Sequence, residues 1–195
     1  MSAREGGLAP RPRRLADVGW EGWRPRDTAT LVFVLRGAEV LLIHKKRGLG
    51  AGKINGPGGR LEPGETLREC AVREVQEELC VTPQALAWGG ENRFQFADGY
   101  SIHVHVYRAH GLEGTPRETE EAVPLWVPRH AIPYHRMWED DRLWIPHLLA
   151  GRRFAGRFLF ESVESDRMLD HALEVEAAPG TTRAAPGHPP PDAGS

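Results

Sequence analysis

The sequence predicts an α/β fold in which helices cover both faces of one mixed (α+β) sheet, an α/β/α sandwich. Three observations support this prediction. Apolar runs joined by turn residues indicate hairpins, a helix-period stripe follows a capping signal, and 195 residues suffice for one domain with a real core. Composition then sets the edges: a flexible extension at 1–27, a folded unit at 28–176, and a disordered Pro- and Gly-rich tail at 177–195.

Strands are expected where short apolar runs end at turn residues. Arg36-Gly37 separates the two strands of a first hairpin, and Asp98-Gly99, a strong two-residue turn signal, separates those of a second. The expected strands are residues 30–35, 39–44, 86–97, 100–110 and 123–127, while 153–161 and 168–175 are expected to form late strands or a short final helix.

A helix over residues 67–79 is indicated by its start and by its period. Thr66 and Glu69 have the Ser/Thr-x-x-Glu spacing of a capping box. An apolar stripe at helical spacing follows, made of Leu67, Ala71, Val75 and Leu79 with Val72 beside it.

A second helix is expected to run to Leu149. Asp140 or Asp141 can cap its start, and Pro146 should interrupt it because proline lacks the backbone N–H that a helix interior requires.

Three carboxylates, Glu74, Glu77 and Glu78, fall within about one turn of the first helix. Like charges at such spacings cost about 0.2–0.5 kcal/mol per pair. One interpretation is a solvated acidic face. A divalent cation such as Mg²⁺, which takes oxygen ligands, would instead make the cluster favourable. The glycine-rich loop at 55–59 and Arg73 within the cluster favour the metal site, since glycine lets backbone approach a charged ligand.

Charge and apolar content exclude several classes of partner. The net charge is −2 with a pI of about 6.5, so we expect no attraction to nucleic acid polymers or anionic membranes. No apolar run approaches membrane-spanning length, and the start lacks a signal-peptide core. Cys70 and Cys80 are the only cysteines, and they imply no disulfide framework. We therefore expect a cytoplasmic protein, and a monomer.

The acidic helix also carries a family pattern. Six residues fit the spacing G-x5-E-x7-R-E-U-x-E-E-x-G-U, where U is a bulky aliphatic residue: Gly59, Glu65, Arg73, Glu74, Glu77 and Glu78. This pattern resembles the Nudix box, the signature of hydrolases that cleave a nucleoside diphosphate linked to another group.

The resemblance implies a Nudix-type sandwich over residues 28–176 and a catalytic centre of Arg73, Glu74, Glu77 and Glu78. It further implies Mg²⁺, for which Mn²⁺ can substitute, held by the Gly59 carbonyl, the three box glutamates and Glu121. Arg73 is expected to orient a glutamate. Which carboxylate acts as general base is left open.

Beyond the box, residues 30–175 resemble the oxidised-purine nucleoside triphosphate hydrolases, which are MutT-like 8-oxo-dGTP diphosphatases. Three segments carry the likeness: residues 44–56, the loop at 114–121, and Trp138-Glu139-Asp140-Asp141, which is similar to a Trp-Pro-Asp-Asp pocket motif. Such enzymes convert triphosphates of the 8-oxo-dGTP and 2-hydroxy-dATP type to monophosphate and pyrophosphate, which sanitises the nucleotide pool. The resemblance implies a small-molecule nucleotide pocket lined by Thr30, Lys45, Asn55, Gly58, Gly59, Arg60, Phe94, Phe96, Ile102, Trp138, Asp140 and Asp141.

The residue chemistry suits a purine pocket. Asn55 offers both a donor and an acceptor to a base edge. Trp138 can stack on a base, a contact worth about 1–3 kcal/mol. Asp140 and Asp141 should not both ionise at low cost, so one of them is expected to stay protonated and to donate a hydrogen bond.

Three departures from the family pattern bear on stability and on base preference. Cys80 stands where the box has glycine in a left-handed cap, at a cost of about 1 kcal/mol. Aromatic residues of the pocket wall are replaced, and so is the proline of the Trp-Pro-Asp-Asp motif. The replacements are Leu49, Ile54, Pro57 and Glu139.

Alternative functions remain. The chain could be a Nudix hydrolase of a nucleotide sugar, dinucleotide or coenzyme, a non-catalytic nucleotide-binding Nudix module, or a merely stable domain with an acidic helix. The complete set of box glutamates argues against the last two.

His103 and His105 alternate on one strand and could suggest a zinc pair. We expect ordinary polar-face histidines there because the sequence offers no third ligand at suitable spacing.

Overall fold

The computed structural model describes residues 11–177 of the chain. Residues 1–10 of the expected extension and the expected tail from 178 onward lie outside the described part. Among residues 11–177, none of the helices is both long and apolar enough to cross a membrane.

Strands dominate the described residues. The strands are β1 (Asp27–Arg36), β2 (Glu39–Lys45), β3 (Ile54–Asn55), β4 (Thr82–Pro83), β5 (Ala87–Phe96), β6 (Ser101–Ala109), β7 (Leu112–Glu113), β8 (Ala122–Pro128), β9 (Phe154–Phe160) and β10 (Met168–Val175). The α-helices are α1 (Leu67–Leu79) and α2 (Asp141–Leu149), and the 3-10 turns are η1 (Leu15–Asp17), η2 (Trp20–Gly22), η3 (Arg129–Ala131) and η4 (Tyr134–Arg136).

The main sheet is mixed, as predicted. Its strand order is β10-β9-β5-β6-β1-β2-β3, with β8 also paired to β2. β1 runs parallel to β6 and β5 parallel to β9, while the other neighbours are antiparallel.

Both predicted hairpins form. β1 pairs with β2 up to Arg36 and Glu39, and β5 pairs with β6 on either side of Asp98-Gly99. Gly99 has a φ of +103°, which glycine adopts without strain, and the Asp98 side chain accepts a hydrogen bond from the Tyr100 amide at 3.1 Å. The turn chemistry read from the sequence therefore fixes this pairing.

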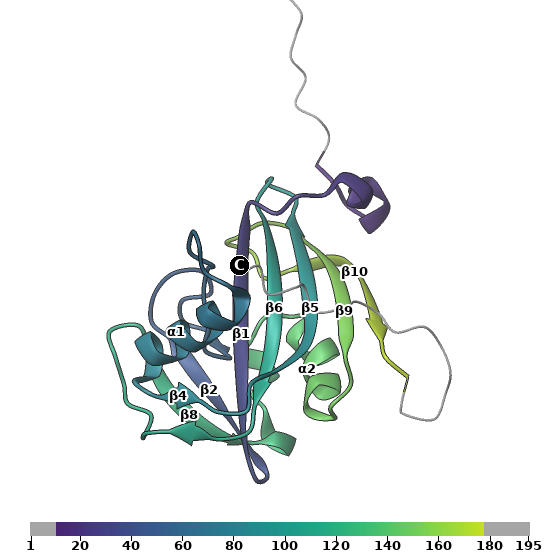
Figure 1. Cartoon of the computed structure of the whole chain (residues 1–195). Helices are drawn as coiled ribbons and strands as arrows, with labels where there is room; N and C mark the ends of the chain where they lie inside the picture. Colours follow the sequence, from purple (N-terminus) through teal and green to yellow (C-terminus); the bar gives the residue numbers. More distant parts are fainter. Residues whose placement is uncertain (1–10, 178–195) are drawn as a thin grey trace, which may run out of the picture.

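The two helices pack on opposite faces of the sheet, which confirms the sandwich (Figure 1). Alternation along β1 divides its side chains between two cores. Val32 and Val34 join the core under α1, and Phe33 and Leu35 join the core that holds α2.

Helix α1 has the predicted bounds and the predicted cap. The Glu69 amide donates to the Thr66 hydroxyl at 3.2 Å, and the Thr66 amide donates to the Glu69 carboxylate at 2.9 Å. The helix ends at Cys80, whose φ of 58° and ψ of 32° are left-handed. The residue that stands in place of the family glycine thus adopts the glycine conformation.

Two expectations for the second helix are wrong. α2 continues through Pro146, because Trp144, Ile145 and Leu148 are buried in the core and packing outweighs the lost backbone bond. Asp140 occupies the position before the helix but makes no side-chain cap, and its carboxylate is engaged elsewhere. The segments at 153–161 and 168–175, whose sequences are compatible with strands or a short final helix, form β9 and β10.

The segment at 11–26 is more ordered than the expected flexible extension. The Leu15 amide donates to Asp170 of β10 at 2.8 Å, and Trp23 donates its ring N–H to Gln95 of β5 at 2.9 Å. The sequence gives little sign of this packing, since the tryptophans of the segment have no periodicity.

Candidate active site

A cavity of about 420 Å³ opens mainly on the face of the sheet that carries α2, and Glu74 of α1 also contributes to its lining. This volume lies within the usual range for a small-molecule site. All twelve residues predicted to bind substrate line the cavity: Thr30, Lys45, Asn55, Gly58, Gly59, Arg60, Phe94, Phe96, Ile102, Trp138, Asp140 and Asp141.

Other lining residues were missed by the sequence prediction. Val104 follows Ile102 by two positions on β6, so strand alternation could have identified it. Phe160 lies beside Phe96 only because β9 runs parallel to β5, a pairing that no local pattern reveals. Of the residues expected to replace aromatic side chains in the pocket wall, Leu49 lines the cavity, whereas Ile54, which is buried in the core, and Pro57 do not.

One end of the cavity is aromatic. The ring of Trp138 meets that of Phe160 nearly at right angles, with 5.8 Å between centroids. The Lys53 ammonium lies 5.1 Å from the centroid of the Trp138 ring, a cation–π contact. These contacts hold an indole plane at the cavity wall, where it can cover a flat ligand.

The two adjacent acids at this end are both 2% exposed. Asp140 accepts a hydrogen bond from the Trp144 ring N–H at 2.8 Å, and Asp141 accepts one from the Trp138 amide at 3.0 Å. Each acid is thereby held in place by one donor. The other lone pairs of its carboxyl oxygens can accept hydrogen bonds from a ligand.

Burial controls the protonation of this acid pair. It raises the pKa of Asp140 to about 7. It also raises the pKa of Asp141 well above its usual range, and the neighbouring Asp140 charge adds to that increase. A carboxyl group here can therefore remain protonated near neutral pH and donate a hydrogen bond, as the sequence predicts.

Asn55 on β3 lines the same cavity. Its side-chain oxygen accepts a hydrogen bond from the Gly56 amide at 2.8 Å. That bond orients the side-chain amide. Its NH₂ group remains a donor that a base carbonyl or ring nitrogen can accept.

The other end of the cavity meets α1 and carries charges of both signs. Glu74, Gly59 and Glu121 line the cavity there, and so do the basic side chains of Lys45, Arg47 and Arg60. Burial raises the pKa of Glu74. The Gly59 carbonyl accepts a hydrogen bond from the Thr30 amide at 2.9 Å and a long one from the Cys70 thiol at 3.8 Å.

Glu78 lies fully buried beside this end and outside the cavity lining. Its carboxylate accepts hydrogen bonds from Lys45 Nζ and from the Gly58 amide, each at 2.8 Å. Burial raises the pKa of Glu78, while the Lys45 charge acts in the opposite direction. Glu78 thus joins α1 to β2 and to the glycine loop.

Arg73 connects the acidic residues of the box. It makes two hydrogen bonds to Glu65, at 2.7 and 3.0 Å, and single bonds to Glu74 at 2.9 Å and Glu77 at 3.0 Å. It also donates to the Arg60 carbonyl at 3.0 Å. This geometry suits the expected role of orienting glutamates.

The remaining predicted ligands lie toward solvent. The Glu77 side chain is 53% exposed and stands outside the cavity lining, while Glu121 lines the cavity and pairs with Arg47. Carboxylate and carbonyl oxygens are the ligands that Mg²⁺ prefers. Glu74 is already paired with Arg73 and Glu78 with Lys45, so the fit to a divalent metal rests on the oxygen chemistry of this donor set.

The chain is similar to known proteins over most of its described length. Residues 25–148 match the family described as "NUDIX domain". A zebrafish protein (Danio rerio) named "Oxidized purine nucleoside triphosphate hydrolase" is 43% identical over 149 residues, covering 75% of this chain and 94% of that protein. The mouse protein of the same name (Mus musculus) is 40% identical over 150 residues, covering 76% and 95%. Among solved structures, the MutT protein of Bacillus halodurans superposes with a TM-score of 0.68 at 24% identity, covering 76% of this chain and 97% of that chain, which supports the fold.

Proposed function

The chain belongs to the Nudix hydrolase family, and from this premise we propose that it hydrolyses oxidised purine nucleoside triphosphates to the monophosphate and pyrophosphate. The observation that carries the proposal is one cavity with two chemically different ends. A buried acid pair beside an indole ring occupies one end, and glutamates held by an arginine occupy the other.

The acid pair supports an oxidised purine as the base. Asp140 or Asp141 can donate or accept a hydrogen bond according to which of them holds a proton. Oxidation of a purine exchanges donor and acceptor positions on its edge. An acid pair in which either side chain can be the donor and the other the acceptor fits such edges. Trp138 would stack on the purine ring, and Asn55 would supply a further donor.

The glutamate end supports hydrolysis of the phosphate chain. Arg73 holds Glu74 at the cavity wall, and Lys45 places a positive charge next to Glu78. A divalent cation held by Glu74, Glu77, Glu78, Glu121 and the Gly59 carbonyl would neutralise phosphate charge and activate the attacking water. One of the carboxylates would accept the proton of that water.

We also propose the identity of the metal, the oligomeric state, the compartment and the class of ligand. The cation is Mg²⁺, with Mn²⁺ able to replace it. The chain acts as a monomer in the cytoplasm, and its ligand is a free nucleotide rather than a nucleic acid polymer or a membrane surface. The net charge of −2 supports the last point.

The experiment is a steady-state comparison on 8-oxo-dGTP, 2-hydroxy-dATP, dGTP and dATP with Mg²⁺, together with a nucleotide sugar and a dinucleotide. We expect higher kcat/KM for at least one oxidised purine, with monophosphate and pyrophosphate in equal amounts. Equal rates on oxidised and normal purines would refute the substrate class. A preference for the nucleotide sugar or dinucleotide would establish the alternative Nudix activity.

A further inference from the structure

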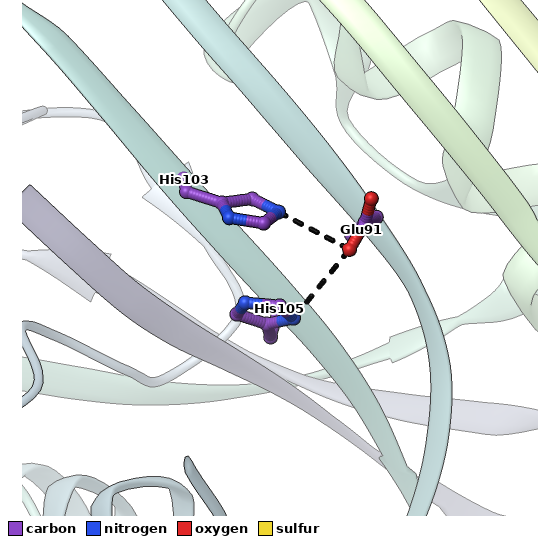
Figure 2. A group of neighbouring side chains, drawn as sticks. All are labelled: Glu91, His103 and His105. Carbon is purple, nitrogen blue, oxygen red and sulfur yellow. Dashed lines mark ion pairs between the residues drawn. The ribbon is translucent and has the colours of Figure 1, made fainter. Parts of the chain in front are cut away.

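Two histidines and a glutamate converge on the sheet outside the active site. His103 and His105 of β6 both point at one carboxylate oxygen of Glu91 on β5 (Figure 2). His103 Nε2 lies 3.2 Å from Glu91 Oε2, and His105 Nδ1 lies 3.9 Å from the same oxygen. The expectation that these histidines lack a third partner is therefore wrong. Glu91 was missed because it precedes them by a whole hairpin and meets them only through strand register.

The cluster lies on the opposite face of the sheet from the nucleotide cavity. Ile102 and Val104 line that cavity, and His103 and His105 alternate with them along β6. α1 packs on this same face but lies over β1, so it does not cover β5 and β6, which lie to one side of it (Figure 1). A ligand here would not compete with substrate.

Two buried ring nitrogens in the cluster, His103 Nε2 and His105 Nδ1, make no well-aligned hydrogen bond, although both lie within ion-pair distance of Glu91 Oε2. His105 as a whole is only 5% exposed. A buried polar atom without a well-aligned partner is destabilising. Both nitrogens face the same point beside the Glu91 carboxylate, so one additional partner could satisfy them together.

The surroundings of Glu91 suit a metal ligand set. Arg93 donates to the other oxygen, Glu91 Oε1, at 3.2 Å. That bond orients Oε2 toward the histidines, as outer partners do in metal sites.

We propose that Glu91 Oε2, His103 Nε2 and His105 Nδ1 bind a zinc ion, with water as the fourth ligand. The ligand atoms lie within 4.8 Å of one another. Tetrahedral zinc with bonds of about 2.0–2.1 Å places its ligands about 3.4 Å apart, so small side-chain rotations complete the site. Two imidazoles and a carboxylate favour zinc over Mg²⁺, which prefers oxygen ligands. This site is therefore chemically distinct from the box glutamates.

The test uses the full chain without an added histidine tag, stripped of metal by a chelator and kept in excess Mg²⁺ to fill the box. We expect one zinc ion to bind per chain. His103→Gln should weaken zinc binding at least about tenfold, and Glu77→Gln, changed in the box, should leave it unaltered. Bound Co²⁺ should give the visible absorption of a tetrahedral site with nitrogen and oxygen ligands. Addition of zinc should displace the Co²⁺ and remove that absorption.

His105 is buried, so its substitution risks the fold, and proton NMR of the unchanged protein gives an independent measurement. Among the nine histidines, the ring signals of His103 and His105 should shift together on addition of zinc. Zinc binding that survives His103→Gln, or that disappears with Glu77→Gln, would overturn the proposal. So would zinc-induced shifts confined to other histidines.

Discussion

The Glu74 carboxylate occupies the space that a β-carbon on Gly59 would fill. The glycine therefore lets the backbone of the loop lie directly against the acid at the cavity wall. Gly59 has no positive φ, so the requirement for glycine here comes from close approach and not from backbone strain. This contact joins the two halves of the family pattern, the loop and the helix.

Substitution of Gly59 tests this contact. Gly59→Ala should push the Glu74 side chain from its position and lower kcat by about tenfold or more, because the carboxylate no longer meets the phosphates correctly. Stability should change little, since the displaced group is the end of a flexible side chain. Gly22→Ala is the control, because a β-carbon there meets nothing within 4 Å. Equal activity of the two variants would contradict the role given to the contact.

Glu77→Gln should lower turnover by orders of magnitude while the fold persists. Its side chain is 53% exposed and is held only by Arg73 at 3.0 Å, so the amide removes charge without opening the core. Turnover with Mg²⁺ and the melting temperature are to be measured side by side. Glu62→Gln changes an exposed acid nearby and should be neutral in both. Full activity of Glu77→Gln would end the metal-site assignment.

Local signals predicted much of this structure. The cap at Thr66, the turn at Asp98-Gly99 and the start and end of α1 are encoded by neighbouring residues, and each forms as expected. The twelve residues expected to bind substrate line one cavity, and their role in binding stays a prediction. They were identified by the family resemblance and not by the chemistry of each residue.

Features that depend on distant packing were not predicted. α2 passes through Pro146 because its buried face outweighs the missing amide bond. Phe160 reaches the cavity through a parallel pairing with β5, and Glu91 reaches His103 through the hairpin register. In each case the deciding contact joins residues far apart in the chain, and a window of sequence does not contain it.

Cys80→Gly should stabilise the protein by about 1 kcal/mol without altering activity. Cys80 has a left-handed backbone with a φ of 58°, in which a side chain is strained and glycine is not. For a chain of this size the gain corresponds to a rise of about 2–4 °C in melting temperature. Denaturant unfolding and a thermal scan both measure it. A loss of stability would show that the thiol makes a contact that exceeds the strain.

Asp140→Asn should change how stability depends on pH. Burial raises the pKa of Asp140 to about 7 from a usual value near 4, so the folded state binds a proton that the unfolded state releases. The contribution of Asp140 to the free energy of unfolding is fully present below about pH 4 and is lost as the pH rises to about 7. The variant should therefore lose stability less steeply across that interval and gain relative stability at pH 8. The measurement is the free energy of unfolding of both proteins at pH 5 and at pH 8. The same change in free energy between the two pH values in both proteins would refute the raised pKa of Asp140.

The same pair of acids should separate base selection from phosphate chemistry. Asp140→Asn and Asp141→Asn each fix one side chain as a neutral amide, so the pair can no longer exchange donor and acceptor. We expect each variant to lose selectivity for oxidised over normal triphosphates by about ten- to a hundredfold in kcat/KM, as an unpaired buried polar group costs about 1–3 kcal/mol. Metal binding, measured by titration with Mn²⁺, should persist, because Glu74 and Glu78 lie at the other end of the site. Glu139→Gln is the matched control: it alters the neighbouring acid, whose carboxylate accepts a hydrogen bond from the Met168 amide at 2.7 Å. If that control loses selectivity as much as the aspartate variants do, the effect comes from the shape of the loop or from the Glu139 charge, which also raises the pKa of Asp140, and not from the exchange of donor and acceptor between Asp140 and Asp141.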